Sequence, residues 1–333
     1  MASNVPPTSG IRVPQGDLQD LVARCFAASG TSAADAELIS RLLVRTDLRG
    51  VHSHGTQQAP GYTALMRQGR VNPQPRLQVV HETATTRVVD GDGGMGHFPC
   101  YEGTVWAIEA AKRYGTAAVT TRNHFHFGAA SKYTLLALDR DCIGIAISSH
   151  RYPLRPDAPI GRVNGGSPIS IAVPAGDQPP LVLDMGAGLL PWSEELFKQS
   201  PFSYFKELGI AAVNRTLGGV LAGIFLPQFQ PPESPWESNQ GAFIAVYDLA
   251  CFMPLDQAKA QMDRFIAEAR AMRPFPGFER AELPGGLEWQ RQQDYARDGI
   301  PVSPAHQQGL QGMADELGLS TPFARYEHTR FTL

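Results

Sequence analysis

The stretch VVDGDGGMGH, residues 88–97, decides between two folds. Gly91, Gly93 and Gly96 spell the pattern G-x-G-x-x-G, with a strand-like run before it and a helix-like run, 101–114, after it. In a Rossmann fold this pattern lets the backbone approach the pyrophosphate of a dinucleotide. The alternative is a tight turn that joins a strand to a helix and has no ligand.

The residues around this glycine pattern favour the turn. A Rossmann fold needs an acidic residue at the end of the next strand, about 20 residues on, to bind the ribose. The next strand-like run is 117–121, and Arg122 follows it with no Asp or Glu. An arginine there suits a 2′-phosphate, but the bulky pair 97–98 and then Pro99 stand where the helix should approach the phosphate closely.

The composition is that of a globular protein and excludes several classes. The chain has 333 residues, 43% of them hydrophobic and 18% charged, which allows a substantial core. A formal net charge of −3 offers no basic surface for nucleic acid. No apolar run is long enough to span a bilayer, and residues 1–13 lack the apolar core of a signal peptide. We therefore expect a cytoplasmic protein that binds neither nucleic acid nor membranes.

Helical and strand-like patterns alternate in the middle of the chain, whereas the first third is helical. Runs with helical spacing are 17–28, 32–47, 60–68, 101–114, 129–139, 202–221, 255–272, 288–297 and 304–317. Runs typical of strands are 77–80, 87–90, 117–121, 143–149, 169–173, 180–184 and 241–247. The order predicts an α/β fold with a mixed sheet. Its parts are an N-terminal helical part (1–75), a central α/β domain (76–250) and a C-terminal helical part (251–333) that packs back on the first.

Five of the nine histidines cluster in three short motifs. His52 and His54 lie in GVHSHGT, His124 and His126 in RNHFHFG, and His150 follows the strand-like run IGIAISS. A histidine donates or accepts a proton near neutral pH, as oxidation of an alcohol or reduction of a carbonyl requires. In an extended chain the i,i+2 spacing points both members of a pair to one side, so a four-histidine metal site is the alternative.

Metal and redox motifs find little support elsewhere. The four cysteines are far apart and form no C-x-x-C pair. Asp90 and Asp92 suggest calcium, but the twelfth position of such a loop, where an EF-hand needs Glu, is Tyr101. Because metal binding normally recruits a carboxylate or a cysteine as well as histidine, we predict no metal site.

Three side chains suited to chemistry come at or just after the ends of predicted strands. His126, His150 and Asp184 belong to three different strand ends. Ligand sites in open α/β sheets gather at the carboxyl ends of strands, so we expect these residues to face one crevice. Three roles are open for Asp184 there: orienting a histidine, binding a ribose hydroxyl, or capping a helix.

Motifs along most of the chain resemble the malate/L-lactate dehydrogenase family, which is distinct from the Rossmann lactate dehydrogenases. In the order of the family they are DLRGVHSHGTQQAPGYTALMRQGRVN, VVDGDGGMG, RNHFHFGAASKY, GGSPISIAVP, LVLDMG, FKELGIAAVNRTLGGVLAGI, NQGAFIAVYD and PFPGFERAELPGG. The resemblance implies a non-Rossmann mixed sheet flanked by helices, a homodimer, and a nicotinamide cofactor near the subunit interface. It also implies that the glycine run is a strand-to-helix turn.

The resemblance implies roles for individual residues. Ser53 and His54 match the S-H-G motif that faces the substrate, and His126 matches the histidine that accepts the proton in hydroxy-acid oxidation. Further residues expected to face the substrate are Gln58, His124 and His150. Residues expected at the cofactor are Asp184, Met185, Gly186, Lys206, Glu207, Gly285 and Gly286.

The sequence departs from the family at some of these positions. Gln58 stands where relatives often carry an arginine suited to a substrate carboxylate, and residues 165–168 read G-G-S-P in place of G-T-N-P. His150 replaces a small polar residue. Glu207 replaces the glycine after the cofactor lysine and would bring a negative charge toward phosphate or ribose. The segment 184–206 is also shorter than in relatives.

Three functions follow from these observations. The first is an NAD- or NADP-dependent oxidoreductase acting on a small C=O, C=N or 2-hydroxy-acid-like substrate, with His126 exchanging the proton. The second is a non-redox enzyme on the same scaffold (a lyase, hydrolase, isomerase or cyclase) that has lost the cofactor, which the altered positions favour. The third is a binding protein that keeps only the fold. Because the histidines suited to proton transfer remain, we favour the first.

Overall fold

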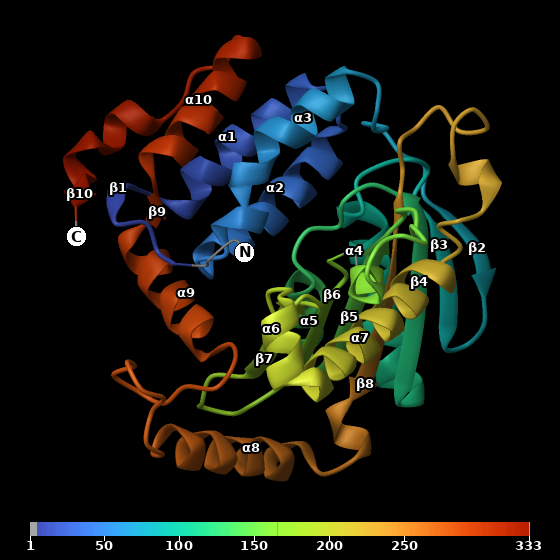
Figure 1. The fold of residues 1–333 in the computed structure, drawn as a ribbon. Helices are drawn as coiled ribbons and strands as arrows, with labels where there is room; N and C mark the ends of the chain where they lie inside the picture. The colour runs from blue at the N-terminus through green and yellow to red at the C-terminus, as the bar shows by residue number, and fades with distance from the viewer. Residues whose placement is uncertain (1–4, 165, 333) are drawn as a thin grey trace. The chain divides into compact units, whose positions relative to one another are not determined.

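The computed structural model describes residues 5–164 and 166–332, and the chain divides into two compact units. Unit 1 combines Met1–Pro75 with Gly286–Leu333, and unit 2 is Arg76–Gly285 (Figure 1). Residues 251–285, which the sequence assigns to the C-terminal part, belong to unit 2 instead. The reason is local, because the carboxylate of Asp263 accepts hydrogen bonds from the backbone N–H groups of Gly176, Asp177 and Gln178.

Unit 1 is mainly helical. Its helices are α1 (Gln15–Ala28), α2 (Ala33–Leu48), α3 (Ala59–Arg67), α9 (Gly286–Asp298) and α10 (Pro304–Glu316). Ser32 begins α2 by accepting a hydrogen bond from the backbone N–H of Asp35, as expected of an N-cap serine. Gly30 and Gly50 follow α1 and α2 with positive φ, a conformation that ends helices.

A small antiparallel sheet in unit 1 is absent from the sequence-based prediction. It has the order β10–β1–β9, with β1 at Ser9–Val13, β9 at Ile300–Val302 and β10 at Phe331–Thr332. The alternating residues Ile11 and Val13 of β1 are fully buried. Strands of two to five residues carry too little pattern to be recognised, and their partners lie at the other end of the chain.

Unit 2 contains a seven-stranded mixed sheet of order β2–β3–β4–β8–β5–β6–β7. The strands are β2 (Gln78–Glu82), β3 (Thr86–Asp90), β4 (Thr116–His124), β5 (Cys142–His150), β6 (Pro168–Val173), β7 (Leu181–Gly186) and β8 (Gln240–Asp248). Only β3 and β4 pair in parallel, and every other neighbouring pair is antiparallel. The α/β class with a mixed, non-Rossmann sheet flanked by helices is therefore confirmed.

Helices cover both faces of this sheet. They are α4 (His97–Tyr114), α5 (Ser131–Leu138), α6 (Glu194–Gln199), α7 (Pro201–Arg215) and α8 (Leu255–Arg270), with a π-helical turn, η4, at Thr216–Val220. On β5, Ala146 lies in the core formed with α4 and α5, whereas Ser149 meets Gly219 of η4. Successive residues of a strand point to opposite faces, so η4 packs on the face opposite α4 and α5.

The strand directions place three strand ends at one edge of the sheet. Strand β8 lies between β4 and β5 and is antiparallel to both, and β6 lies in the same way between β5 and β7. The carboxyl ends of β4, β5 and β7 therefore meet at one edge, the carboxyl edge. His124 and His150 are both paired with Gln240, one on each side of β8. This edge positions the candidate site of unit 2.

Candidate active site

The glycine run 91–96 is a loop that holds the end of β4. The backbone N–H groups of Gly91 and Gly93 donate to the carbonyl oxygens of Arg122 and Asn123, both at 2.9 Å. The N–H of Gly96 donates to the carbonyls of Phe125 and His126, each at 3.2 Å. The donors that a nucleotide-binding loop would direct at phosphate are therefore used within the protein.

Close packing explains why this loop needs glycine. A Cβ atom at Gly96 would lie 2.6 Å from Nδ1 of His124, and one at Gly93 would lie 2.1 Å from the ring of Trp236. Gly93 also has a φ of +71°, which disfavours side chains with a Cβ. The pattern G-x-G-x-x-G thus has a complete structural cause here, and α4 begins directly after it at His97.

His124 is buried against the glycine loop, although the sequence analysis predicts that it faces the substrate. It has no exposed surface, its Nδ1 lies 2.7 Å from the carbonyl oxygen of Phe125, and its Nε2 lies 2.9 Å from the hydroxyl of Thr121. Burial lowers its pKa to about 4, against an opposing effect of the Phe125 carbonyl. His124 is thus neutral at pH 7, and both ring nitrogens are occupied inside unit 2.

His126 follows β4 in a segment whose backbone is held on both sides. Gly96 donates to the His126 carbonyl, and the hydroxyl of Tyr133 donates to the carbonyl of Phe127 at 2.6 Å. The His126 side chain is half-buried. A rigid backbone with a side chain that retains solvent access is the arrangement that positions a group for proton transfer.

Asp184, on β7, caps a helix at the same edge. Its exposed carboxylate accepts a hydrogen bond of 3.1 Å from the backbone N–H of Ser131, the first residue of α5. Negative charge at a helix N-terminus is favourable. Of the three roles left open for Asp184, helix capping is the one that this hydrogen bond supports, and it links β7 to the segment that follows His126. The neighbouring residues Met185 and Gly186 are half-buried and exposed.

His150 ends β5, with its ring 5.0 Å from that of Tyr152. Burial lowers its pKa, and the positive charge of Arg215 lowers it further. The ring is half-buried and forms no hydrogen bond to any residue that the structure describes. His150 therefore stands at the carboxyl edge in its neutral form.

Lys206 and Glu207 are neighbours on α7 that point into different surroundings. Lys206 is exposed and forms no ion pair within the described ranges. Glu207 is 8% exposed, and its carboxylate accepts a hydrogen bond from the backbone N–H of Leu190 at 3.1 Å. The negative charge of Glu207 is thus engaged in bracing the short segment before α6. This is not the exposed position beside phosphate that the sequence suggested.

Gly285 closes unit 2 against the edge strand β7. A Cβ there would lie 2.8 Å from Cβ of Val182, and φ is +93°. The preceding carbonyl, of Pro284, accepts a hydrogen bond from the N–H of Val182. Gly286 begins α9 in unit 1 and is buried. Gly285 therefore has a packing reason to be there.

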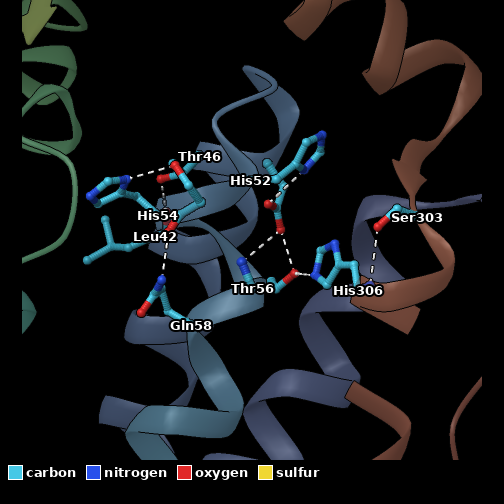
Figure 2. A network of polar contacts seen from close by, with 10 residues as sticks. Leu42, Thr46, His52, His54, Thr56, Gln58, Ser303 and His306 are labelled. Carbon is cyan, nitrogen blue, oxygen red and sulfur yellow. Dashed lines mark hydrogen bonds and ion pairs between the residues drawn. The ribbon is translucent and has the colours of Figure 1, made fainter. Parts of the chain in front are cut away.

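A buried carboxylate organises the S-H-G loop of unit 1 (Figure 2). Asp47, near the end of α2, is 0% exposed, and its Oδ1 lies 3.1 Å from Nδ1 of His52. Its Oδ2 accepts hydrogen bonds from the backbone N–H and the hydroxyl of Thr56, at 2.9 and 2.6 Å. Burial opposes ionisation, but His52, with smaller effects of His306 and Thr56, holds the pKa of Asp47 below its usual value.

The network continues from Thr56 to His306 of α10. The Thr56 hydroxyl lies 2.9 Å from Nε2 of His306, and burial lowers the pKa of His306 to about 4. The ring of His52 is 6.0 Å from that of His306 and 6.4 Å from that of Tyr295, where it stacks. Two buried nitrogens, Nε2 of His52 and Nδ1 of His306, have no hydrogen-bond partner among the described residues.

The candidate residues Ser53, His54 and Gln58 lie on the outside of this loop. The Ser53 hydroxyl is 3.0 Å from Nδ1 of His54, and the Gln58 amide donates to the Ser53 carbonyl at 2.7 Å (Figure 2). Gly55 completes the motif because a Cβ there would lie 1.9 Å from Oδ1 of Asp47. Gln58, at the position where relatives often carry arginine, closes the turn through its amide.

The expected side-by-side arrangement of His52 and His54 is wrong. The two residues belong to a 3-10 turn, His52–His54, so their side chains point to different sides, as Figure 2 shows. His124 is likewise enclosed. Across the described residues, no group of three or more His, Cys, Asp or Glu side chains is arranged to hold a metal. None of the helices in the described ranges could span a bilayer.

The structure divides the predicted site residues between the units. Unit 1 holds Ser53, His54, Gln58 and Gly286, and unit 2 holds His124, His126, His150, Asp184, Met185, Gly186, Lys206, Glu207 and Gly285. Sequence reasoning missed Asp47, Thr56 and His306. The signal for Asp47 was available, because an acidic residue on a mostly apolar helix five residues before HSH needs a partner. His306, about 250 residues away, gave no local signal.

Comparisons with known proteins identify the relatives of this chain. The profile of the family described as malate/L-lactate dehydrogenase matches residues 13–194 and 188–311. A malate dehydrogenase from Pyrococcus horikoshii is 29% identical, over 93% of this chain and 96% of that protein. An L-sulfolactate dehydrogenase from Methanocaldococcus jannaschii is 28% identical, over 87% and 93%. The solved structure of the Pyrococcus enzyme matches with a TM-score of 0.83 at 28% identity, over 95% of this chain and 98% of that chain.

The relatives and the solved structure are dehydrogenases, which are oxidoreductases. The fold and the relatives therefore assign this protein to the oxidoreductases. The chain belongs to the malate/L-lactate dehydrogenase family. The family that the sequence motifs resemble is thereby confirmed. The two matched stretches overlap at residues 188–194, inside the segment that the family resemblance implies is shorter than in relatives.

Proposed function

We propose that this protein is a nicotinamide-dependent oxidoreductase of a small 2-hydroxy acid or of the corresponding C=O or C=N compound. The observation that carries the proposal is the rigidly held His126 at the carboxyl edge of a sheet shared with dehydrogenases. Relatives named malate and L-sulfolactate dehydrogenase supply the substrate class.

His126 is the proposed proton acceptor. In the oxidation direction the substrate hydroxyl gives its proton to the His126 ring, and in reduction the protonated ring returns it to the new oxygen or nitrogen. Ser53 and His54 are proposed to orient the substrate. We do not assign substrate contact to His124, because its nitrogens are occupied by Thr121 and Phe125. The cofactor, when bound, supplies the acceptor or donor of the hydride.

The residues at the carboxyl edge are compatible with a nicotinamide cofactor. Lys206 is an exposed cation without an ion pair in the described ranges, which suits a phosphate. The Glu207 carboxylate, which would oppose a phosphate, is turned to the N–H of Leu190. Asp184, Met185, Gly186, Gly285 and Gly286 are the further proposed cofactor positions. NAD or NADP is the proposed cofactor, and the cytoplasm is the proposed location.

Titration with NADH and NADPH tests the proposal. Wild-type protein should quench or shift the fluorescence of at least one of them, and Lys206→Met should weaken that binding about 10-fold, since one charge-assisted contact is lost. Lys198→Met, which removes a 73% exposed lysine of α6, should leave the dissociation constant unchanged. Absence of binding to both cofactors at millimolar concentration would remove the redox function and leave the non-redox enzyme as the better account.

A homodimer is the proposed assembly. Apolar side chains are exposed along one stretch of unit 2, where the rings of Trp192, Phe197, Tyr204 and Phe205 contact one another and Phe202 is 79% exposed. Exposed apolar clusters of this kind mark protein–protein interfaces. A second copy of the chain is the proposed occupant, in line with the homodimer that the family resemblance implies.

Light scattering coupled to gel filtration tests the dimer. Wild-type protein is expected at the mass of two chains, and Phe202→Asp should shift it to the mass of one chain, because a charge in an apolar interface is costly. Phe275→Asp is the matched control, since Phe275 is 83% exposed outside the aromatic cluster. A monomeric wild type, or a Phe202→Asp variant that stays dimeric, would contradict the assignment.

A further inference from the structure

Arg215, the last residue of α7, is a buried cation without a carboxylate partner. Arg215 is only 7% exposed, and its single hydrogen bond within the described residues runs from an Nη atom to the carbonyl oxygen of Tyr152 at 3.0 Å. No Asp or Glu among the described residues forms an ion pair with it. Burying an unpaired charge is costly, so a buried cation is normally met by an anion.

Two aromatic rings fix the plane of this guanidinium. Its central carbon lies 4.1 Å from the ring centre of Tyr152 and 5.2 Å from that of Phe225. The other nitrogen, Nη1, is enclosed and has no hydrogen-bond acceptor in the described part of the chain. Ring stacking leaves the edge of a guanidinium available for bidentate contacts with an oxyanion. Phe225, the second of these rings, is 39% exposed.

Close helix packing brings Arg215 to the carboxyl edge of the sheet. A Cβ at Gly218 would lie 2.7 Å from the backbone of Ser148, and one at Gly219 would lie 3.2 Å from Cβ of Ser149. These glycines let η4 press directly onto the end of β5, where His150 stands. The charge of Arg215 is near enough to contribute to the lowered pKa of His150.

The surroundings add positive charge and no compensating negative charge. Arg151, next to His150, donates to the backbone carbonyls of Ile224 and Ser238 and forms no ion pair with a described residue. The end of β5 therefore carries two arginines whose charges no described carboxylate balances, beside the neutral ring of His150. An anion bound there would supply the missing negative charge. Arg151 would attract that anion by its positive charge alone, because its guanidinium already donates to backbone carbonyls.

We propose that Arg215 and His150 form a subsite for an oxyanion, the carboxylate of the substrate being its primary ligand. That this carboxylate belongs to a 2-hydroxy acid rests on the proposed function. A cofactor phosphate presents the same oxyanion chemistry and is the second source.

Calorimetric titration with oxalate, a small dicarboxylate that needs no turnover, tests the subsite. Wild-type protein should bind oxalate, and Arg215→Gln should weaken binding about 10- to 100-fold, the loss expected for charge-assisted hydrogen bonds. Arg264→Gln removes a 72% exposed arginine of α8 and should change nothing. Arg215→Lys keeps the charge but loses the planar fork, so it should fold as the wild type does and bind with intermediate affinity.

The same variants distinguish the two sources and the two proposals. Weakened oxalate binding with unchanged NADH binding assigns the subsite to the substrate, and the reverse assigns it to a cofactor phosphate. Oxalate binding that depends on Arg215, in a protein that oxidises no hydroxy acid, supports the subsite and removes the proposed function. A wild type that oxidises malate, with the same KM in folded Arg215→Gln and Arg215→Lys variants, overturns the subsite and keeps the function. Wild-type protein that binds neither oxalate nor NADH overturns the subsite as well.

Discussion

Replacing His126 by alanine is expected to lower kcat by about 10²–10⁴-fold, the usual share of general acid–base catalysis. The substitution should leave the fold intact, because the contacts that hold this segment run through backbone atoms. Gly96 donates to the carbonyl of His126, and Tyr133 donates to that of Phe127. The rate of NAD- or NADP-linked oxidation of malate, followed by absorbance, is the measurement.

Two comparisons make the His126→Ala experiment decisive. The dissociation constant of NADH should stay the same, because the proposed role of His126 is proton transfer and not cofactor binding. His81→Ala, which removes an exposed histidine of β2, should leave kcat unchanged. Equal turnover in His126→Ala and wild type would remove His126 from the mechanism.

Replacing Asp47 by alanine is expected to lower the free energy of unfolding by about 3–5 kcal/mol, the cost typical of breaking a buried charged network by removing one partner. The substitution strips the partner from Nδ1 of His52 and from the backbone N–H and hydroxyl of Thr56. Because these groups shape the loop of Ser53 and His54, turnover should fall as well. Urea denaturation followed by circular dichroism measures the stability.

The same network makes stability depend on pH with a definite sign. The pKa of Asp47 is lowered in the folded state, so its contribution is present above its usual pKa and is lost as the solution becomes more acidic. The pKa of His306 is lowered from 6.5 to about 4, so its contribution is complete above 6.5 and is lost as the pH falls toward about 4. Wild-type protein should therefore lose stability on acidification from about pH 7 to about pH 5.

A matched control separates this network from surface charge. Asp20→Ala removes an exposed carboxylate that pairs with Arg24 one turn along α1, and it should cost about 0.5 kcal/mol or less. Asp47→Asn keeps the volume and one acceptor, so its loss of stability should lie between those of the two alanine variants. An Asp47→Ala variant as stable as Asp20→Ala would show that the network does not hold the loop.

The sequence predicts the sheet of unit 2 well because its strands carry their own hydrophobic patterns. It also predicts that the ends of β4, β5 and β7 share an edge, since that depends only on strand direction. It fails for the three-stranded sheet of unit 1, whose strands are short and pair across nearly the whole chain. Local pattern contains no information on such distant partners.

Side-chain direction is the second limit of the sequence. His124 and Glu207 lie in motifs that resemble a site, yet one turns into the core and the other to the N–H of Leu190. Arg215 is the reverse case, since nothing in VNRTLGG distinguishes a buried arginine from a surface one. The direction of each of these side chains depends on the packing of residues far apart in the sequence. Glycines at 96, 218 and 219 permit such close packing.

The position of β8 has a consequence for the order in which the protein folds. Strands β4 and β5 do not pair with each other, and both pair with β8, whose Asp248 faces Cys142 of β5. The centre of the sheet therefore cannot close during synthesis until the chain beyond residue 240 has left the ribosome. The small sheet of unit 1 can form only later in synthesis, because β1 pairs with residues 300–302 and 331–332. Long-range pairing of this kind slows folding, so a nascent chain spends much of its synthesis with unpaired strand edges, a state in which chaperones would be of use.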